Sequence, residues 1–383
     1  MSLPEARYQR QMQLPRFGAE GQARIGAARV LVVGCGALGT VVCEQLVRAG
    51  VGSRGGSGSG SLTIVDRDTV ELSNLQRQTL FTEQDARRGV PKAEAAKARL
   101  AQVHSTAVVR AFVDDLHAAN ALDYAKRCDL IVDCLDNFET RALLNDCAVA
   151  LRLPLMYGGA VGLTGMSAAL LPHGEGVHAA FGGSVGWSDA RTTPCLRCLM
   201  PDLPAPGEVA SCESAGILGA TAGIVASLQA GTALRLLAEG AEHVPAQLVR
   251  FDLSSLRFES VSLAGARDAS CSCCMARRFA ALESPHATAG CRVVCGRNAV
   301  EVHLGGALGE EEFARLESRL RGAGVVASSL HGGTRLVKVD LSAQGEGPTG
   351  ISVLAGDAAT LAIVDGTRDL EQARATIARW IGV

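Results

Sequence analysis

An N-terminal series of glycine, amide and charged residues has the types and the order that a nucleoside triphosphate site needs. The apolar residues 30–33 are followed by the turn Gly34-Cys35-Gly36-Ala37-Leu38-Gly39. Three glycines at this spacing let a strand turn tightly into a helix, so that backbone N–H groups can reach a phosphate. The turn alone fits any nucleotide or dinucleotide. The residues that narrow the choice are Asp66, Ser73, Asn74, Leu75, Gln76, Arg77, Lys92, Asp136 and Asn137.

These later residues supply an amide, a guanidinium, an ammonium and a carboxylate. A triphosphate and its metal need such groups, whereas a nicotinamide cofactor does not. Each group also has an ordinary structural interpretation. Arg77 and Lys92 could be solvated surface charges, and Asp136 with Asn137 could cap a helix over residues 138–150. We favour the ATP site because the residues occur together and in order.

Thirteen cysteines form a second notable set. In a long chain without a visible secretory signal they serve metal or thiol chemistry more often than disulfides. Cys195-x-x-Cys198 and Cys271-x-x-Cys274 are two pairs whose spacing lets both sulfurs approach one ion. We predict a tetrahedral structural zinc site, with metal-free buried cysteines as the alternative. Cys273 leaves the register of the second pair open, and the two-residue spacing favours Cys271 with Cys274.

Composition excludes some classes of protein. Lys and Arg number 37 against 39 Asp and Glu, and no long basic run is present, so we expect no nucleic-acid partner. The first residues are polar, which indicates a cytoplasmic protein without a secretory signal. The apolar residues 219–238 are long enough to span a membrane. They are weakly hydrophobic and contain Arg235, so we predict a buried helix and no membrane association.

The elements that must position these residues follow an alternating order. Apolar strands are expected at residues 30–33, 62–65, 108–112 and 130–134, with helical segments such as 91–102 between them. This order predicts an α/β fold with a Rossmann-like, doubly wound parallel sheet. The Gly/Ser-rich residues 52–61 are expected to be a flexible inserted loop. The insertion explains why Asp66 lies further from the glycine turn than the usual spacing of about 20 residues.

We expect two domains in 383 residues. The first covers residues 1–285 and includes a crossover loop at 201–213, which leads into a helix that begins near Ser214. The second covers residues 291–383, where the pattern of strand, helix, several strands and helix predicts a small α+β domain.

Residues 7–275 resemble the ThiF/MoeB family, bacterial relatives of the ubiquitin-activating enzymes. The resemblance rests on five motifs in the family's order, a series far more specific than any one member. The motifs are Arg7-Tyr8-Gln9-Arg10-Gln11, the glycine turn, Leu72-Ser73-Asn74-Leu75-Gln76-Arg77-Gln78, Pro91-Lys92 and Asp133-Cys134-Leu135-Asp136-Asn137.

The resemblance implies adenylation of the C-terminal glycine of a small ubiquitin-like sulfur-carrier protein with a Gly-Gly tail. In this interpretation Arg77 and Lys92 contact the phosphates, and Asn74 and Gln76 orient them. Asp136 holds Mg²⁺, and Asp66 accepts the ribose hydroxyls. Arg10 is an arginine finger that reaches the phosphates of a neighbouring subunit, which requires a homodimer.

Cys212 lies at the end of the crossover loop, just before the expected helix N-terminus, where the helix dipole favours a thiolate. It also aligns with the family cysteine that attacks the acyl-adenylate. We favour a covalent role over an idle loop thiol. In MoeB-like proteins such a cysteine need not be catalytic, because sulfur can come from a separate donor such as a cysteine desulfurase.

The residues from Cys291 to Arg297 fit the Cys-x5-Arg spacing of rhodanese and phosphatase anion loops. Such a loop should open a helix, whereas residues 298–304 alternate like a strand, so we reject this interpretation. Residues 295–300 instead resemble the C-terminal extension of some ThiF proteins of thiazole synthesis, which favours a ThiS-like carrier for thiamine.

Several alternatives stay open. The carrier could be the MoaD-like protein of molybdopterin synthesis or a conjugating ubiquitin-like protein, because adenylation is common to all of them. From other classes, an NAD-dependent oxidoreductase or a non-enzymatic scaffold that binds ubiquitin-like partners could use the same fold. The oxidoreductase leaves Arg10, Asn74, Arg77, Lys92 and Asp136 unexplained.

Overall fold

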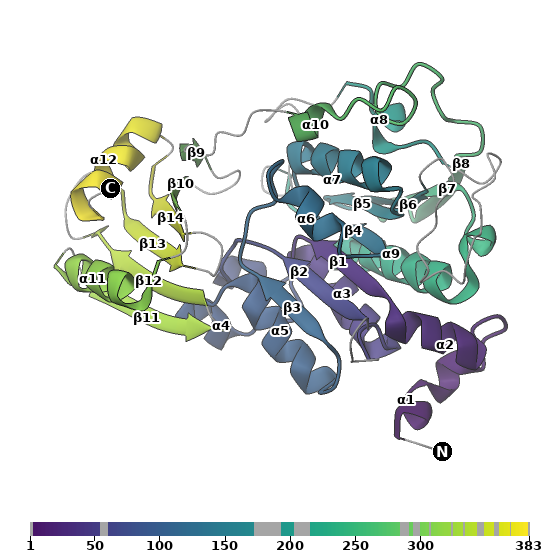
Figure 1. The fold of residues 1–383 in the computed structure, drawn as a ribbon, viewed down its shortest axis with the longest axis horizontal. Coiled ribbons are helices and arrows are strands. Elements are labelled where there is room, and N and C mark those ends of the chain that lie inside the picture. Colours follow the sequence, from purple (N-terminus) through teal and green to yellow (C-terminus); the bar gives the residue numbers. More distant parts are fainter. Residues whose placement is uncertain are drawn as a thin grey trace.

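The computed structural model describes residues 3–53, 60–171, 193–202, 215–283, 291–293, 299–305, 308–322, 325–331, 334–342, 348–355, 360–367 and 369–381. Two β-sheets organise these residues (Figure 1). The first sheet has eight strands in the order β3-β2-β1-β4-β5-β6-β7-β8. Its strands are β1 (Arg29–Val33), β2 (Ser61–Val65), β3 (Val109–Phe112), β4 (Leu130–Asp133), β5 (Leu155–Val161), β6 (Thr164–Leu170), β7 (Gln247–Asp252) and β8 (Arg257–Ser262).

The first five strands of this sheet are parallel, and β6, β7 and β8 continue it with antiparallel pairings. The predicted strands β1 to β4 are confirmed, with ends that differ by one residue at most. Alternate side chains of β1 enter different cores: Val30 and Val32 pack on one face, and Leu31 and Val33 on the other. Burial on both faces explains why the central strands β1 and β4 are largely apolar, as is usual for parallel sheets covered by helices.

Helices cover both faces, as the predicted Rossmann-like fold requires. On one face lie α3 (Ala37–Ala49), α5 (Lys92–Val103) and α9 (Gly219–Glu239), and on the other lie α6 (Ala121–Ala125) and α7 (Phe138–Leu151). The N-terminal helices α1 (Leu3–Met12) and α2 (Gly18–Ala27) adjoin the first group. The remaining short helices are η1 (Leu72–Asn74), α4 (Glu83–Arg88), α8 (Leu196–Leu199), η4 (Ala241–His243) and α10 (Ala280–Glu283).

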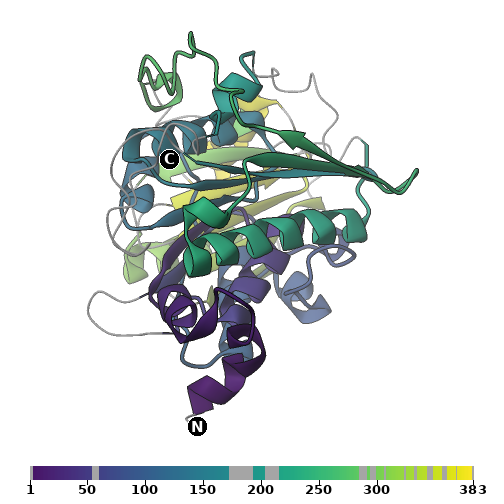
Figure 2. The same ribbon diagram turned by 90° about the vertical axis from the view of Figure 1, so that its right-hand side faces the viewer.

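Helix α9 lies along one face of the sheet, beside the long antiparallel strands (Figure 2). Among the described residues it is the one helix with the length and hydropathy of a membrane span, and half of that span is buried. It packs against α3, β5 and β6, as predicted for a core helix. The expected start near Ser214 was wrong, because the helix begins at Gly219, after extended backbone at Leu218.

The second sheet has six antiparallel strands in the order β11-β12-β13-β14-β10-β9. The apolar faces of α11 and α12 pack on one side of it. On its other side Leu336, Leu354 and Ile363 pack with Val113, which follows β3. The elements are β9 (Cys291–Val293), β10 (Ala299–Gly305), α11 (Glu310–Arg321), β11 (Val325–His331), β12 (Thr334–Asp340), β13 (Gly350–Ala355), β14 (Thr360–Asp365) and α12 (Leu370–Trp380).

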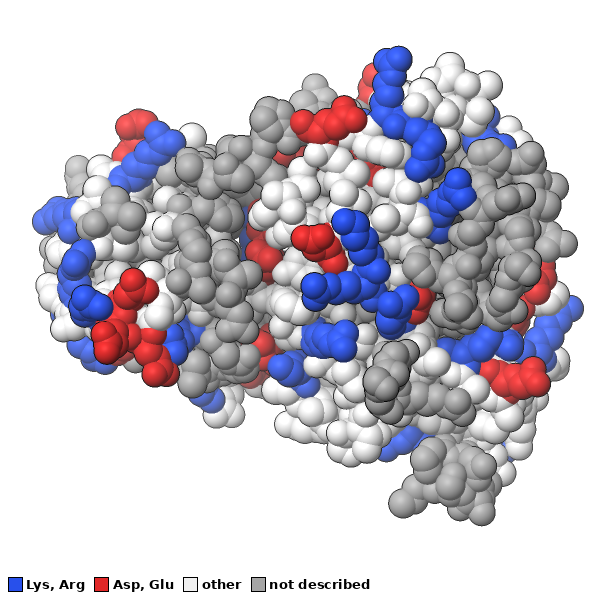
Figure 3. Space-filling model, in the orientation of Figure 1, with Lys and Arg blue, Asp and Glu red and all other residues white. Residues whose placement is uncertain are grey.

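The predicted α+β character of the C-terminal part is thus confirmed. Cys291–Val293 and Ala299–Gly305 form the antiparallel strands β9 and β10, where the rejected anion-loop interpretation would have required a helix after the loop; residues 294–298 lie outside the described residues. On the face of the molecule in Figure 3, acidic and basic side chains are interspersed among uncharged ones.

Candidate functional site: the carboxyl edge of the parallel sheet and a four-cysteine cluster

The nucleotide-site residues predicted from the sequence come together where three parallel strands end. Gly34 follows β1, Asp66 follows β2, and Asp136 lies just beyond the end of β4. Strands β2 and β4 flank β1 on either side, and the chain order of the strands reverses there. Ligands of open α/β sheets bind at such a reversal, outside the carboxyl ends of the strands.

The glycine turn has the close backbone approach that its sequence predicts. Gly34 has a φ of +88°, and a Cβ atom there would lie 2.5 Å from the carbonyl oxygen of Cys134. A Cβ atom at Gly39 would collide with the carbonyl oxygen of Gly34. Gly36, at the N-terminus of α3, differs, because the nearest group to a Cβ atom there is the Gln78 amide nitrogen at 3.7 Å. The turn therefore leaves open space at a helix N-terminus, which fits a phosphate.

Asp66 holds the glycine turn from the neighbouring strand. One of its carboxylate oxygens accepts the N–H of Cys35 at 2.6 Å, and the other accepts the N–H of Asp68 at 2.8 Å. Burial raises the pKa of Asp66 to about 6, although the nearby ammonium of Lys92 opposes this shift. Asp66 is thus a partly desolvated carboxylate beside the turn, in a position to accept further hydrogen bonds.

Lys92 is the first residue of α5 and is buried, with 9% of its side chain exposed. Its ammonium donates to Asp68 Oδ2 at 2.8 Å, and its N–H donates to the carbonyl oxygen of Asp68. Burial lowers the pKa of Lys92, but the carboxylates of Asp68, Asp66 and Asp136 more than offset this and raise it. Lys92 is therefore a fixed cation that faces three carboxylates. Sequence reasoning missed Asp68, although its spacing of two residues from Asp66 was visible.

The segment from Ser73 to Arg77 forms a compact turn around η1. Asn74 is buried, and its side-chain oxygen accepts the N–H of Glu71 at 3.0 Å, so part of its amide stabilises the turn itself. Arg77 Nη1 donates to the carbonyl oxygen of Ser73 at 2.9 Å. Leu75 packs against the core, and the exposed Gln76 has its backbone beside Gly219, where α9 begins. In the described structure the guanidinium of Arg77 therefore contacts its own turn, and this hydrogen bond does not go to the group formed by Lys92, Asp66 and Asp68 (the Lys92 group).

Asp136 and Asn137 have different surroundings. Asn137 caps α7, because its side-chain oxygen accepts the N–H of Thr140 at 2.9 Å. Asp136 is exposed, and one of its oxygens lies 3.5 Å from the Asn137 amide nitrogen. Capping thus occupies the Asn137 oxygen, whereas the charge of Asp136 contributes to raising the pKa of Lys92. An exposed carboxylate next to the open glycine turn has the chemistry of a Mg²⁺ ligand.

Two further buried polar residues lie beneath this loop, and the sequence analysis assigned no role to either. Arg141 on α7 and Gln229 on α9 donate hydrogen bonds to backbone carbonyl groups around β4 and β5. Arg141 is followed by Ala142, Leu143 and Leu144, and a long charged side chain beside this apolar run was the available signal.

The four predicted zinc ligands form one cluster. Their sulfur atoms lie within 4.8 Å of one another, with 3.7 Å between Cys195 and Cys271 and 3.4 Å between Cys198 and Cys274. Sulfurs on a tetrahedral zinc ion at about 2.3 Å would lie about 3.8 Å apart. The donor set and its size therefore fit zinc, and the cluster could hold that ion.

The register of the second pair is settled by Cys273. Its sulfur interacts with Cys195 but is not among the four that lie within 4.8 Å of one another, and it lies 3.3 Å from Asp146 Oδ1 and from the Asn145 amide nitrogen on α7. Asn145 also accepts the N–H of Leu196, and Asp146 accepts the N–H of Ala281. Helix α7 thus orients both cysteine-bearing segments, as the surroundings of a metal site should.

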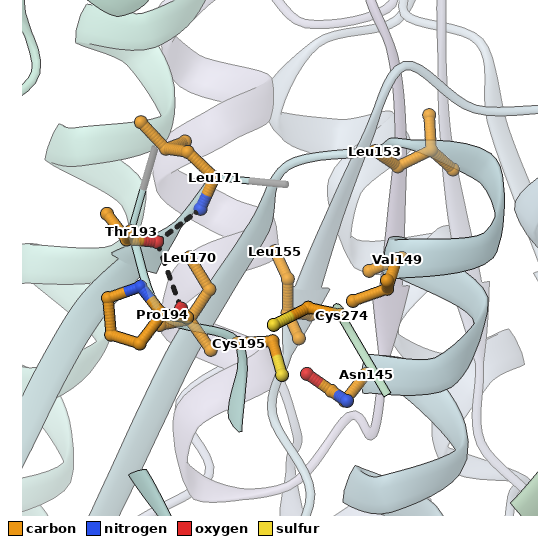
Figure 4. A pocket seen from close by; sticks show the side chains of 11 residues that line it. Asn145, Val149, Leu153, Leu155, Leu170, Leu171, Thr193, Pro194, Cys195 and Cys274 are labelled. Carbon is orange, nitrogen blue, oxygen red and sulfur yellow. Dashed lines mark hydrogen bonds between the residues drawn. The ribbon is translucent and has the colours of Figure 1, made fainter. Parts of the chain in front are cut away.

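A small cavity lies behind the cluster, lined by Leu153, Leu155, Leu170, Cys195 and Cys274 among others (Figure 4). Thr193 closes one side of it by accepting the N–H of Leu171 at 2.7 Å (Figure 4). Its volume of about 10 Å³ approaches that of a single water site, so it offers no room for an organic cofactor.

Arg10 lies away from this edge. It is exposed near the end of α1, and the next residue, Gln11, donates to the carbonyl oxygen of Ala49 at the far end of α3. Helix α3 begins at the glycine turn and has 13 residues, a length of roughly 20 Å. Arg10 is therefore remote from the nucleotide residues of its own chain. Cys212 lies outside the described residues, and α9 begins at Gly219 rather than near Ser214.

Comparisons with known proteins agree with this arrangement. The chain is 35% identical to the sulfur carrier protein ThiS adenylyltransferase of Bacillus subtilis (strain 168), over 98% of this chain and 99% of that protein. It is 39% identical to the sulfur carrier protein adenylyltransferase of Thermus thermophilus, over 67% of this chain and 86% of that protein. The crystal structure of E. coli MccB with MccA-N7isoASN has a similar fold, with a TM-score of 0.56 at 20% identity over 72% of this chain and 75% of that one.

The ThiF family matches residues 8–273, which contain the glycine turn, the Lys92 group and the four-cysteine cluster. With the whole-length relative, this match leaves no ambiguity of family. The chain belongs to the ThiF family.

Proposed function

We propose that the protein is an ATP-dependent adenylyltransferase that activates the C-terminal glycine of a ubiquitin-like sulfur-carrier protein. One observation carries this proposal: Asp66, Lys92 and Asp136 converge beside an open glycine turn at the carboxyl edge of the sheet. The relatives named as sulfur-carrier adenylyltransferases support the same activity.

In this reaction the terminal carboxylate of the carrier attacks the α-phosphorus of ATP. A bond forms between carboxylate oxygen and phosphorus as the bond to the bridging oxygen breaks, and pyrophosphate leaves. The approach of two anions is opposed by their charge, so fixed cations lower the barrier. Lys92 and Arg77 would contact phosphate oxygens, the N–H groups of the glycine turn would hold the phosphate chain, and Asp66 would accept the ribose hydroxyls.

A Mg²⁺ ion bound with ATP would neutralise further phosphate charge, and Asp136 is the residue that would hold it. The residues fit this role, because Asp136 is an exposed carboxylate next to the buried Lys92.

We also propose that Zn²⁺ occupies the cluster of Cys195, Cys198, Cys271 and Cys274. Since ATP is the cosubstrate, we place the enzyme in the cytoplasm.

We propose a ThiS-like carrier. The Bacillus subtilis relative matches almost the whole chain, including the C-terminal sheet, and its name specifies ThiS. The Drosophila grimshawi relative named MOCS3, an adenylyltransferase and sulfurtransferase, matches 70% of this chain. A MoaD-like carrier is therefore the second candidate.

We expect the carrier to dock on the antiparallel edge of the first sheet. Large apolar side chains are exposed on β6, β8 and the turns beside them, at Leu163, Met166, Leu256 and Phe258. Exposed apolar side chains near the edge strand of a sheet, here β8 among the described residues, are typical of an interaction surface. Phe258→Asp should raise the KM for the carrier and leave ATP binding unchanged.

We also propose a homodimer in which Arg10 completes the partner's site, because Arg10 cannot reach the site of its own chain. A shallow apolar groove between α3 and α9 is available to a second copy, and its lining residues are Val41, Ala220, Gly223, Ile224, Ser227 and Leu228.

For Cys212 we propose attack on the carrier adenylate. Cys212→Ala should retain adenylation but lose the thiol-sensitive carrier adduct in a mass spectrum, and an unchanged adduct would reject this role.

The test is ATP–pyrophosphate exchange with a panel of carriers that end in Gly-Gly, run beside Asp136→Ala. Exchange that one carrier supports and the variant lacks would establish adenylation and identify the carrier. If zinc-loaded, folded protein shows no exchange with any carrier, the proposal is wrong, and a binding scaffold becomes the better interpretation.

A further inference from the structure

Arg141 is a buried cation whose contacts converge on the loop that carries Asp136. Only 6% of its side chain is exposed. Its Nη2 atom donates to the carbonyl oxygens of Leu135 at 2.5 Å and Gly158 at 2.7 Å, and its Nη1 atom donates to the hydroxyl of Tyr157 at 3.3 Å. Burial of a guanidinium is costly unless its donors are satisfied. The burial of Arg141 therefore needs a structural or functional explanation.

Asp133 is the second residue that fixes the loop carrying Asp136. It is fully buried at the end of β4, its Oδ1 atom accepts the N–H of Leu135 at 3.0 Å, and its Oδ2 atom lies 3.6 Å from Arg141 Nε. Leu135 is thus held on both sides, by its N–H through Asp133 and by its carbonyl oxygen through Arg141. The residue that follows it is Asp136.

Neighbouring side chains hold Arg141 and Asp133 in place. The guanidinium lies over the rings of Phe138 and Tyr157, 5.6 and 5.1 Å from their centres. The amide of Gln229 on α9 donates to the carbonyl oxygens of Asp133 and Met156, at 2.7 and 3.0 Å. The backbone around Asp136 therefore has few degrees of freedom, although the Asp136 side chain is exposed.

We propose that Arg141 is a positioning residue that holds the backbone of Leu135 so that the Asp136 carboxylate is preorganised to bind the divalent cation of the nucleotide. This inference rests on the proposed function, because it takes Asp136 as the Mg²⁺ ligand. Residues that orient a metal ligand typically change metal affinity by about 10- to 100-fold when they are replaced.

The same guanidinium connects this loop to the proposed carrier surface. It holds the Tyr157 hydroxyl and the Gly158 carbonyl oxygen on β5, and the Tyr157 hydroxyl lies 3.7 Å from the sulfur of Met166 on β6. Met166 is 39% exposed. Arg141 therefore joins the strands near the carrier surface to the metal-binding loop.

The experiment compares Arg141→Lys in the full-length protein with wild type. Lysine keeps the charge but cannot reach the carbonyl groups of Leu135 and Gly158 and the Tyr157 hydroxyl at once. Mn²⁺ binding, read by electron paramagnetic resonance in the presence of a non-hydrolysable ATP analogue, needs no carrier and no turnover. We expect the dissociation constant for Mn²⁺ to rise about 10-fold or more, with metal-free binding of the analogue unchanged.

Arg29→Lys is the matched control, because Arg29 pairs with Asp129 at the amino end of the same sheet. It should leave Mn²⁺ affinity at the wild-type value. Equal Mn²⁺ affinity in folded Arg141→Lys and wild type would overturn the inference. Wild-type protein that binds neither the analogue nor Mn²⁺ would instead count against the proposed function. If Arg141→Lys does not fold, Tyr157→Phe, which removes one contact of Arg141, should still raise the dissociation constant for Mn²⁺, and no rise there would also overturn the inference.

Discussion

The ammonium of Lys92 lies 2.8 Å from a carboxylate oxygen of Asp68, which is two residues beyond the ribose candidate Asp66. The pair keeps a buried cation charged and aimed at the edge of the sheet before any nucleotide arrives. Asp68 is 43% exposed at its side chain and Lys92 only 9%, so the carboxylate can turn towards water while the ammonium stays. Phosphate oxygens can thus replace Asp68 as the partner of Lys92.

Lys92→Met should lower kcat for pyrophosphate exchange by about 100- to 1,000-fold, the usual effect of losing one preorganised donor to developing charge. It also removes the ammonium that pairs with the Asp68 carboxylate at 2.8 Å, which should destabilise the fold. Lys92→Met combined with Asp68→Asn separates these effects, because it removes both charges. Thermal unfolding should recover in the double variant while exchange stays low. Recovery of exchange along with stability would show that Lys92 is only structural.

Asp66 should give ATP binding a pH dependence. Burial raises its pKa to about 6 in the folded protein, above the value of about 3.9 in an unfolded chain. The folded state therefore holds more protons than the unfolded state between about pH 4 and pH 6, so this group's contribution to stability falls as pH rises through that range. The ionised form, which prevails above pH 6, is the one that can accept hydrogen bonds from ribose on both oxygens.

We therefore expect ATP affinity to fall as pH is lowered through about 6. Asp66→Asn should weaken binding and remove this inflection, since its amide does not titrate and only one oxygen remains to accept the N–H groups of Cys35 and Asp68. Equilibrium binding of a fluorescent ATP analogue from pH 5 to pH 8 measures both effects. An inflection that persists in Asp66→Asn would assign it to another group.

The four-cysteine cluster predicts about one zinc ion per chain, measured by elemental analysis of purified protein. Cys274→Ser should lose the ion and lower the unfolding temperature. Cys273→Ser is the matched control, because Cys273 is adjacent in sequence and borders Cys195 but is not one of the four grouped sulfurs, and it also contacts Asp146 and Asn145. It should keep the ion even though it perturbs a buried contact. Zinc loss in both variants, or in neither, would contradict the assigned ligands.

The parallel half of the first sheet could be predicted because its central strands are buried on both faces and are therefore largely apolar. The antiparallel half of the same sheet, from β6 to β8, could not be predicted. Strand β6 contains Gly165, Ser167 and small residues that carry little strand preference. The reason is tertiary: a Cβ atom at Gly165 would lie 2.5 Å from Val225 on α9. Close packing against a helix more than 50 residues away leaves no local signal.

The site shows the same division. The glycine turn, Lys92 and the cysteine pairs depend on local spacing, so sequence patterns predict them. Asp68 and Arg141 depend on partners that only the fold supplies: Lys92 is 24 residues from Asp68, and Gly158 is 17 residues from Arg141. Helix α9 begins at Gly219 rather than near Ser214, because Leu218 is extended and Ile217 forms a β-bridge with Gly162.

The proposed role of Arg10 predicts complementation between two inactive variants. Arg10→Ala and Lys92→Met should each abolish most pyrophosphate exchange as homodimers. In a mixed dimer, the subunit with intact Lys92 receives Arg10 from its partner, so one of its two sites is complete. Random pairing of equal amounts makes half of the dimers mixed, so about a quarter of wild-type activity should return. If Arg10 instead served its own chain, every site in the mixed dimer would carry one of the two defects, and no activity would return. The helix contacts of α1 favour the first outcome, because they hold Arg10 at the far end of α3 from the glycine turn.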